Sequence, residues 1–200
     1  MKQFAALYTR VDETTKTSVK TSALADYFRT APKDDRLWTI ALFTGRRPKR
    51  TITATKLREW AAEVAGLPDW LFEESYSIVG DLAETIALVL PEPQQTSDES
   101  LTHWIGYIRD LSALDDDARK AGILHAWNSL PATERFLFTK LLTGGFRIGV
   151  SAKLITRALD AMGGETALEA LKPAPVRDRE NELKVKTRKR NRRRNEAFIR

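Results

Sequence analysis

The chain has 200 residues, no cysteine and a formal net charge of +6. This length suffices for one domain with a sizeable core, and the lack of cysteine excludes a disulfide framework and a thiolate metal site. No segment reaches about 18 uninterrupted apolar residues, and the first residues lack the apolar run of a secretory signal, so the sequence predicts a soluble, cytoplasmic protein.

Charge is unevenly distributed along the chain. Residues 176–200 hold eleven Lys and Arg against four Asp and Glu, so the first 175 residues together are nearly neutral. Within them, residues 36–58 carry seven Lys and Arg and no acid, whereas residues 59–100 carry ten acids and no Lys or Arg. The net charge of the whole chain therefore says little about the folded part, but this segregation predicts a molecule with two faces of opposite charge.

Apolar residues recur at three- and four-residue spacing along almost the whole chain, without a convincing alternation of period two. The sequence therefore predicts an all-α protein. Glycine and proline lie between the periodic segments, where helix breakers belong. The expected helices cover residues 2–10, 17–31, 33–44, 53–65, 68–78, 81–90, 100–113, 116–129, 132–143 and 151–162.

One linker and one tail interrupt this pattern. Residues 91–100, rich in Pro, Gln, Ser and acids, divide the expected domain of residues 1–172 into lobes of about 1–90 and 100–172. A short helix is expected to end near Leu171. Residues 173–200 contain too few large apolar side chains to offset the entropy of ordering, so they are predicted to be a basic, disordered tail. We interpret this tail as the product of a reading-frame change after about Gly164, with nonspecific nucleic-acid binding as the alternative.

The segment of residues 140–159 joins two predicted helices through a glycine-rich, basic turn. Gly144 and Gly145 are expected to end the first helix, because glycine tolerates the left-handed conformation at a helix C-terminus. Ser151 is a good N-cap for the second helix. The N–H groups at a helix start attract anions, and three cations add positive charge to the segment: Arg147, Lys153 and Arg157.

This turn carries a family resemblance. Leu142-Thr-Gly-Gly-Phe-Arg-Ile-Gly-Val-Ser151 resembles the end of the N-terminal DNA-binding domain of ATP-dependent DNA ligases, where Leu-Thr-Gly-Gly-x-Arg-x-Gly-Val-Ser precedes a Lys-bearing helix. Upstream, Gly80-Asp-Leu-Ala-Glu84 is similar to that domain's Gly-Asp-Leu-(Gly/Ala)-Glu helix start. Weaker similarities lie at residues 4–10, 20–28 and 37–44, and the resemblance covers roughly residues 1–165.

The resemblance implies an all-α domain that grips duplex DNA from the minor-groove side around a nick. Such contacts go to phosphate and sugar, so they position the protein without reading sequence. The implied roles are nick sealing in DNA repair, replication and recombination, near the nucleoid. The implied contacts are Thr143, Gly144, Gly145, Arg147, Gly149, Ser151 and Lys153 first, followed by Arg157, Gly80, Arg46 and Arg47.

Each of these features also has a purely structural interpretation. From spacing alone, the glycines favour a simple helix connection, and only the resemblance reverses this preference. Asp81 is expected to be an N-cap, since its carboxylate would repel phosphate. A solvated helix end is an equal alternative for Arg46 and Arg47. The tryptophans are expected to pack in the core: Trp38, Trp60, Trp70, Trp104 and Trp127.

Catalytic chemistry is missing from the sequence. The ligase family forms a lysine–AMP bond within a Lys-x-Asp-Gly motif, and no lysine here is followed by x-Asp-Gly. A phosphate-binding Gly-x-x-x-x-Gly-Lys-Ser/Thr loop is also absent. His103 and His125 lack clustered partners, so neither a metal site nor acid–base work is predicted. We therefore expect no catalytic residue, no cofactor and no ligase activity from this chain alone, whereas the full-length family uses ATP and Mg.

Two alternatives to simple DNA binding remain open at this point. The acidic segment of residues 59–100 and its neighbouring grooves could bind a protein, which would make the chain an α-helical interaction scaffold. Alternatively, the chain could be the DNA-gripping half of a split ligase, acting on nicked duplex DNA together with a separate catalytic polypeptide. The expected salt dependence of DNA binding distinguishes the scaffold from both DNA-binding interpretations.

Overall fold

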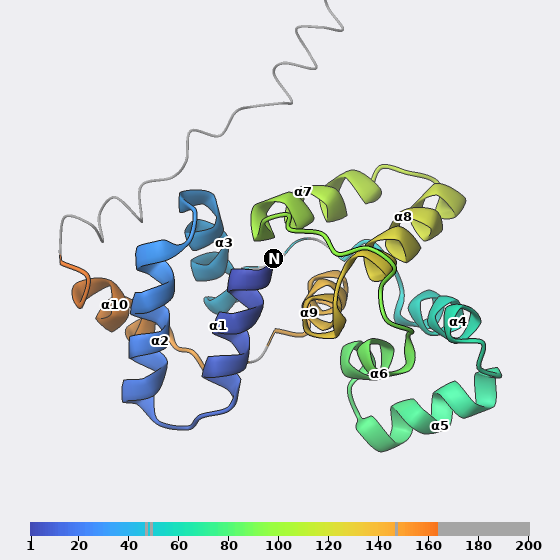
Figure 1. The fold of residues 1–200 in the computed structure, drawn as a ribbon, viewed down its shortest axis with the longest axis horizontal. Coiled ribbons are helices and arrows are strands. Elements are labelled where there is room, and N and C mark those ends of the chain that lie inside the picture. The colour runs from blue at the N-terminus through green and yellow to red at the C-terminus, as the bar shows by residue number, and fades with distance from the viewer. Residues whose placement is uncertain (47, 49, 147, 164–200) are drawn as a thin grey trace, which may run out of the picture.

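The computed structural model describes residues 1–46, 48, 50–146 and 148–163. These residues form ten α-helices and no strand (Figure 1), which confirms the predicted all-α fold. The predicted tail and the helix expected near Leu171 lie outside this range. The helices are α1 (Lys2–Asp12), α2 (Thr17–Thr30), α3 (Lys33–Phe43), α4 (Ala54–Ala65), α5 (Asp69–Val79), α6 (Leu82–Val89), α7 (Leu101–Leu111), α8 (Asp116–Ser129), α9 (Ala132–Thr143) and α10 (Ala152–Asp160).

Local chemistry explains why these helices begin and end where they do. Five of them start after an N-cap residue whose side-chain oxygen accepts the N–H of the residue three positions later. This bond satisfies one otherwise unpaired donor at the helix start. Three end at a glycine in the left-handed conformation, which lacks the Cβ that would oppose it. The five capping residues are Thr53, Asp81, Ser100, Asp115 and Ser151. The three glycines are Gly66, Gly80 and Gly144.

The helices are arranged around α9. At one end of the molecule, α1 and α2 form a hairpin, and α10 packs against α2 (Figure 1). At the other end, α4 and α5 pack against α6, and α8 contacts α4. The central helix α9 packs against α6 and α1, and one continuous apolar core runs through all of them. No helix in the described part is long and apolar enough to cross a membrane.

The segment between α6 and α7 connects two halves of this core. The Gln94 N–H donates to Asn128 Oδ1 at 3.3 Å, and the Ser97 N–H donates to the Ser129 carbonyl at 2.9 Å. These bonds hold the segment against the end of α8. The expected division into two lobes at this segment remains a prediction, and α6 from one expected lobe packs extensively on α9 from the other.

The tryptophans behave as predicted with one exception. Trp60, Trp104 and Trp127 are buried, and Trp38 packs against the core. Trp70 is 69% exposed, so its expected place in the core is wrong. The reason lies in α5, which buries only Phe72 and presents the rest of its surface to solvent or to partial contacts.

Candidate nucleic-acid interface

The glycine-rich turn has the backbone geometry that the sequence predicts. Gly144 ends α9 with a φ of 76°, in the left-handed region. The N–H groups of Gly144 and Gly145 both point back to the Lys140 carbonyl, at 2.8 and 3.3 Å. After the turn, Ser151 caps α10, its Oγ accepting the Leu154 N–H at 3.3 Å. The turn therefore connects two well-defined helix ends.

Two apolar side chains fix the turn to the body of the protein. Phe146 and Ile148 are both buried, whereas Gly145 and Gly149 are exposed. The ring of Phe146 lies 6.2 Å from that of Phe4, and also 6.2 Å from that of Tyr8, both on α1. Because its apolar side chains point inward, the turn presents glycine backbone to solvent.

A buried lysine supports the turn from below. Lys20 of α2 is only 8% exposed, and its Nζ donates to the Ile148 carbonyl at 3.2 Å and to the Gly149 carbonyl at 3.4 Å. A Cβ on Gly149, whose φ is 61°, would lie 3.2 Å from this Nζ. Both the backbone conformation and the lysine therefore favour glycine at this position. The contact also places a positive charge directly beneath the exposed main chain.

A second cation holds the end of α9. Arg50, in the connection between α3 and α4, donates from its guanidinium to the Thr143 carbonyl at 2.9 Å. A cation at this position complements the negative end of the helix dipole. Arg46 lies in the same connection and is exposed. Because Arg50 bonds to the end of α9, this connection is held beside the turn. Arg47 lies outside the described residues.

The two sequence motifs meet beside the turn. Gly80 ends α5 in the left-handed conformation and is exposed. Asp81 caps α6, its Oδ1 accepting the Glu84 N–H at 3.1 Å, and its other oxygen pairs with Lys140 near the end of α9. The ammonium group of Lys140 also lies 5.2 Å from the centre of the Phe136 ring. This ion pair joins segments about sixty residues apart in the sequence.

The pKa of Asp81 reflects its position. Partial burial by itself would raise the pKa, but the hydrogen bond and charge of Lys140 and the main-chain N–H of Glu84 outweigh that effect. The pKa is therefore below its ordinary value. Asp81 acts as the N-cap that its sequence position predicts, and its carboxylate is already neutralised by a cation.

The exposed face of α10 continues the turn. Lys153 and Arg157 lie one helical turn apart and are both exposed, whereas the opposite face of α10 packs on α2. Arg157 lines an open groove of about 470 Å³ between these two helices. The α2 side of the groove presents Thr17, Ser18, Thr21, Ser22 and Arg29. Arg157 therefore lies beside a row of hydroxyl groups and a second arginine.

Sequence reasoning missed three contributors to this surface: Lys20, Arg50 and the hydroxyl row of α2. The contacts of Lys20 and Arg50 span 128 and 93 residues, and no local pattern encodes such distances. Lys20 does leave a signal, because it shares the buried stripe of α2 with Leu24 and Phe28 at four-residue spacing. Arg147, a principal candidate, lies outside the described residues.

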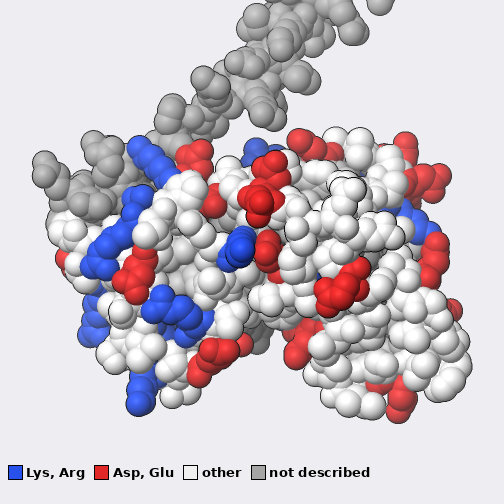
Figure 2. Space-filling view, in the orientation of Figure 1, with Lys and Arg blue, Asp and Glu red and all other residues white. Residues whose placement is uncertain are grey.

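Surface charge is divided between the two ends of the molecule. In the orientation of Figure 2, most Lys and Arg lie over the end built from α1, α2 and α10, and most Asp and Glu lie towards the end built from α4 to α8. The glycine-rich turn and the exposed face of α10 thus belong to the more basic end.

An all-α fold with glycine-bearing turns at residues 80–81 and 143–151 defines the class of domain that the sequence resembles. Residues 1–160 match the family described as DNA ligase N terminus, and the match runs from the start of α1 to the end of α10. The chain therefore belongs to this family, the N-terminal domain of ATP-dependent DNA ligases. No curated protein sequence matches the chain significantly.

Proposed function

We propose that this chain binds duplex DNA around a nick, without sequence preference, through phosphate and sugar. In this proposal the chain binds the DNA during nick sealing in repair, replication or recombination, and a separate catalytic polypeptide carries out the ligation. Family membership supports a ligase-related role. The surface of the glycine-rich turn supports DNA as the ligand.

The observation that carries the proposal is the exposed glycine backbone of the turn, held over the buried ammonium of Lys20 and leading into the start of α10. Glycines at positions 145 and 149 leave room for a phosphate group to approach the main chain. Ser151 already accepts the Leu154 N–H, but the N–H groups of Ala152 and Lys153 precede the first bonds within α10 and lie at its positive end. In this proposal they donate to phosphate oxygens.

The neighbouring residues extend this contact along one strand of the DNA. Lys153 and Arg157 project from the exposed face of α10, where each neutralises a phosphate. Gly80 and Arg46 belong to segments that are held to the end of α9 by the Asp81–Lys140 ion pair and by the bond from Arg50 to Thr143. Asp81 does not oppose binding, because Lys140 compensates its charge. Since these groups address phosphate and sugar, they position the duplex without reading its bases.

The proposal assigns no catalytic residue, cofactor or metal to this chain. Without a Lys-x-Asp-Gly motif, no lysine stands in the setting that the family uses to form its AMP adduct. Incubating the chain with labelled ATP and magnesium is therefore expected to give no covalent protein–AMP band. A band that disappears when one lysine is replaced would contradict this part of the proposal.

The salt dependence of DNA binding tests the interface itself. In Lys153→Ala/Arg157→Ala, loss of two phosphate contacts should reduce the slope of log affinity against log salt by up to about two units. The matched control is Arg109→Ala/Lys120→Ala, which removes the same charge from α7 and α8 at the other end. Both variants are measured as full-length chains against nicked and intact duplexes of one sequence.

The control is expected to keep the salt slope of the unchanged chain. Both double variants should melt normally, because all four side chains lie on the surface or are partly exposed. An equal change in slope for the two pairs would mean that overall charge, and not this interface, governs binding. Failure of the unchanged chain to bind DNA at low salt would remove the proposed function.

A further inference from the structure

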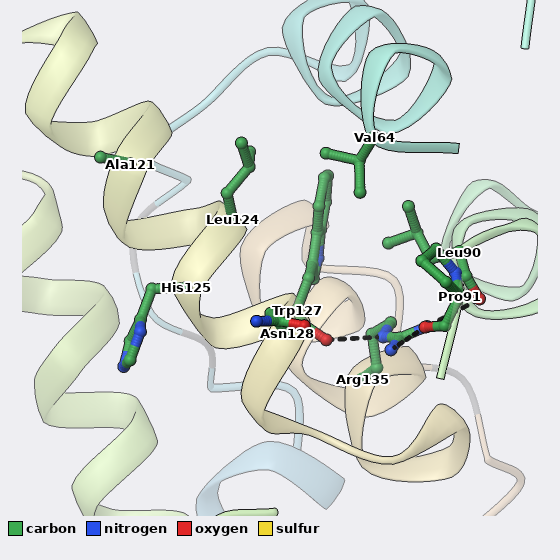
Figure 3. A pocket seen from close by; sticks show the side chains of 9 residues that line it. All are labelled: Val64, Leu90, Pro91, Ala121, Leu124, His125, Trp127, Asn128 and Arg135. Carbon is green, nitrogen blue, oxygen red and sulfur yellow. Dashed lines mark hydrogen bonds between the residues drawn. The ribbon is translucent and has the colours of Figure 1, made fainter. Parts of the chain in front are cut away.

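An apolar groove lies at the start of α9, whereas the glycine-rich turn follows the end of the same helix. This open groove of about 390 Å³ separates the end of α4 from α8 and the end of α6 (Figure 3). Its apolar lining comes from Val64, Leu90, Leu124 and Trp127. Val64 is 37% exposed, so the groove is accessible from solvent. Its volume lies within the range of about 300–1,000 Å³ that is typical of ligand-binding clefts.

Two polar side chains of the groove, Arg135 and Asn128, bond to the protein itself, and the exposed His125 is the remaining polar side chain of the lining. Arg135 is 2% exposed, and its three guanidinium nitrogens donate to the carbonyls of Trp127, Leu90 and Pro91 at 2.9, 3.2 and 2.8 Å, as the dashed lines in Figure 3 show. Asn128 Oδ1 accepts the Gln94 N–H. A polar small molecule needs several convergent free donors and acceptors, whereas this groove is better suited to an apolar side chain.

The surroundings of the groove are acidic. Residues 59–100, which supply its α4 and α6 walls, hold ten acids and no Lys or Arg. Glu63 stands next to Val64, and Glu92 lies close enough to Arg135 to oppose the lowering of its pKa by burial. Lys120 of α8 is already paired with Glu63 at 2.6 Å. Glu63 and Glu92 are thus each opposed by a cation, but residues 54–129, from α4 to α8, hold fourteen Asp and Glu against five Lys and Arg. This excess over the whole end disfavours nucleic acid and favours a cationic partner.

Exposed apolar side chains gather on the same acidic segment. Among the described residues, six large hydrophobic side chains are exposed, and four of them lie between positions 64 and 88. The four are Val64, Trp70, Ile78 and Leu88. Only the first of the four lines the groove, and an exposed apolar side chain in a groove is typical of a protein interaction site.

We propose that this groove docks a basic segment of another protein, which inserts a large apolar side chain against Val64 and Leu124 while its Lys or Arg residues face the surrounding acids. The groove is lined by the ends of α4 and α6, by α8 and by the start of α9, whereas the glycine-rich turn leads from the end of α9 to α10 (Figure 1). Both surfaces can therefore be occupied together, and the docking site does not depend on the proposed DNA binding.

A matched pair of substitutions on α8 tests the proposal. Ala121 is exposed and lines the groove, whereas Ala118 is exposed on the same helix but does not line it. Ala121→Arg places bulk and positive charge at the groove, and Ala118→Arg adds the same charge outside it. Val64→Arg blocks the groove from α4 and serves as a second variant should Ala121→Arg melt abnormally.

The probe is a fluorescein-labelled amphipathic helical peptide of Lys and Leu, titrated with the full-length chain and followed by fluorescence anisotropy. Ala121→Arg and Val64→Arg should each weaken binding by at least about tenfold, because anchor pockets and like charges dominate such contacts. Ala118→Arg should remain within about twofold, as expected for a charge outside the contact. Peptides with Leu replaced by Ser, or Lys replaced by Glu, should bind far more weakly.

Several outcomes would overturn the proposal. Equal weakening by Ala118→Arg and Ala121→Arg would reveal diffuse charge attraction without a groove. Undiminished binding of the Ser peptide would remove the apolar anchor. Sedimentation that detects self-association, abolished by Ala121→Arg, would make a second copy of the chain the occupant. Loss of DNA affinity in Ala121→Arg at constant stability would make the groove part of a nucleic-acid surface.

Discussion

The two ends of the molecule differ in the groups to which their cations donate. At the end with the glycine-rich turn, Lys20 and Arg50 donate to main-chain carbonyls of the turn and of α9. Arg10 and Arg29 at that end share the exposed carboxylate of Asp26.

At the end built from α4, α5 and α8, three basic side chains donate to carboxylates, and a fourth, Arg119, donates both to Asp116 and to main-chain carbonyls. The three pairs are Lys56 with Asp116, Arg58 with Glu73 and Lys120 with Glu63.

This difference decides what each end offers to a partner. A cation bonded to a carbonyl keeps its full charge near the surface, whereas a cation paired with a carboxylate is neutralised. Lys153 and Arg157 then add to an uncompensated positive surface. At the other end, acids remain in excess after pairing. A chain whose first 175 residues are nearly neutral thus presents a more basic end and a more acidic end.

Arg135 can break this comparison, because it lies at the acidic end yet its three hydrogen bonds all go to carbonyls. Arg135→Met would leave these buried acceptors without partners, which should lower the free energy of unfolding by about 3 kcal/mol or more. Urea denaturation measures the change. Arg135→Lys keeps the charge but loses the planar guanidinium, so its free energy of unfolding should lie between those of the unchanged chain and Arg135→Met. A loss below about 1 kcal/mol for the Met variant would show that water readily replaces these bonds.

Gly149 and Gly66 provide a matched test of the turn. Both have left-handed φ values, 61° and 65°, but a Cβ on Gly66 would meet nothing within 4 Å, whereas one on Gly149 would meet Lys20 Nζ at 3.2 Å. Because of backbone strain, each alanine substitution should lower the free energy of unfolding by about 1 kcal/mol. Gly149→Ala should cost somewhat more, because Lys20 must move.

Only Gly149→Ala should also weaken DNA binding, since it alters the exposed backbone of the turn. Thermal melts and DNA titrations of both variants provide the comparison. If the two alanine variants are equally stable and bind DNA equally well, the Lys20 contact has no role in shaping the turn.

The ion pair between Asp81 and Lys140 joins the two motifs, and its effect should depend on pH. Asp81→Asn preserves the N-cap but removes the charge. Because about a third of the Asp81 side chain is exposed, solvent screening weakens the ion pair. The substitution should therefore lower the free energy of unfolding by only about 1 kcal/mol at neutral pH. The carboxylate pKa is lowered in the folded state.

The stabilisation should therefore be complete above the unfolded pKa of about 3.9 and disappear as the pH falls through the folded value. Stability curves of the unchanged chain and Asp81→Asn should converge in acid. Asp26→Asn is the control, since Asp26 pairs with Arg10 and Arg29 while about half exposed. A constant difference between Asp81→Asn and the unchanged chain at all pH values would contradict the ion-pair account.

Most of the fold follows from local sequence. Helix bounds agree with the predicted ones to within two residues, because periodicity, N-caps and glycine C-caps act over a few positions. Trp70 shows the limit of this reasoning. It occupies an apolar position in a helical pattern, but α5 packs along only part of its surface, and that outcome depends on the placement of α4 and α6.

The candidate site was only partly predictable. Gly144 and Ser151 adopt the expected conformations, because turn and cap preferences are local. The support from Lys20 and Arg50 arises only when α2 and the α3–α4 connection fold against the turn. The assignment of DNA contacts to the turn comes from the family resemblance and not from spacing, and it remains a prediction.

Hydrogen–deuterium exchange of the full-length chain, with and without a nicked duplex, tests the central claim most directly. DNA is expected to slow exchange in residues 143–157, at the turn and the start of α10, and around Gly80, while peptides from α4 and α8 exchange unchanged. Protection centred on the acidic end, or no protection anywhere in residues 1–163 under conditions where DNA binds, would contradict the claim that the glycine-rich turn is the DNA-binding surface.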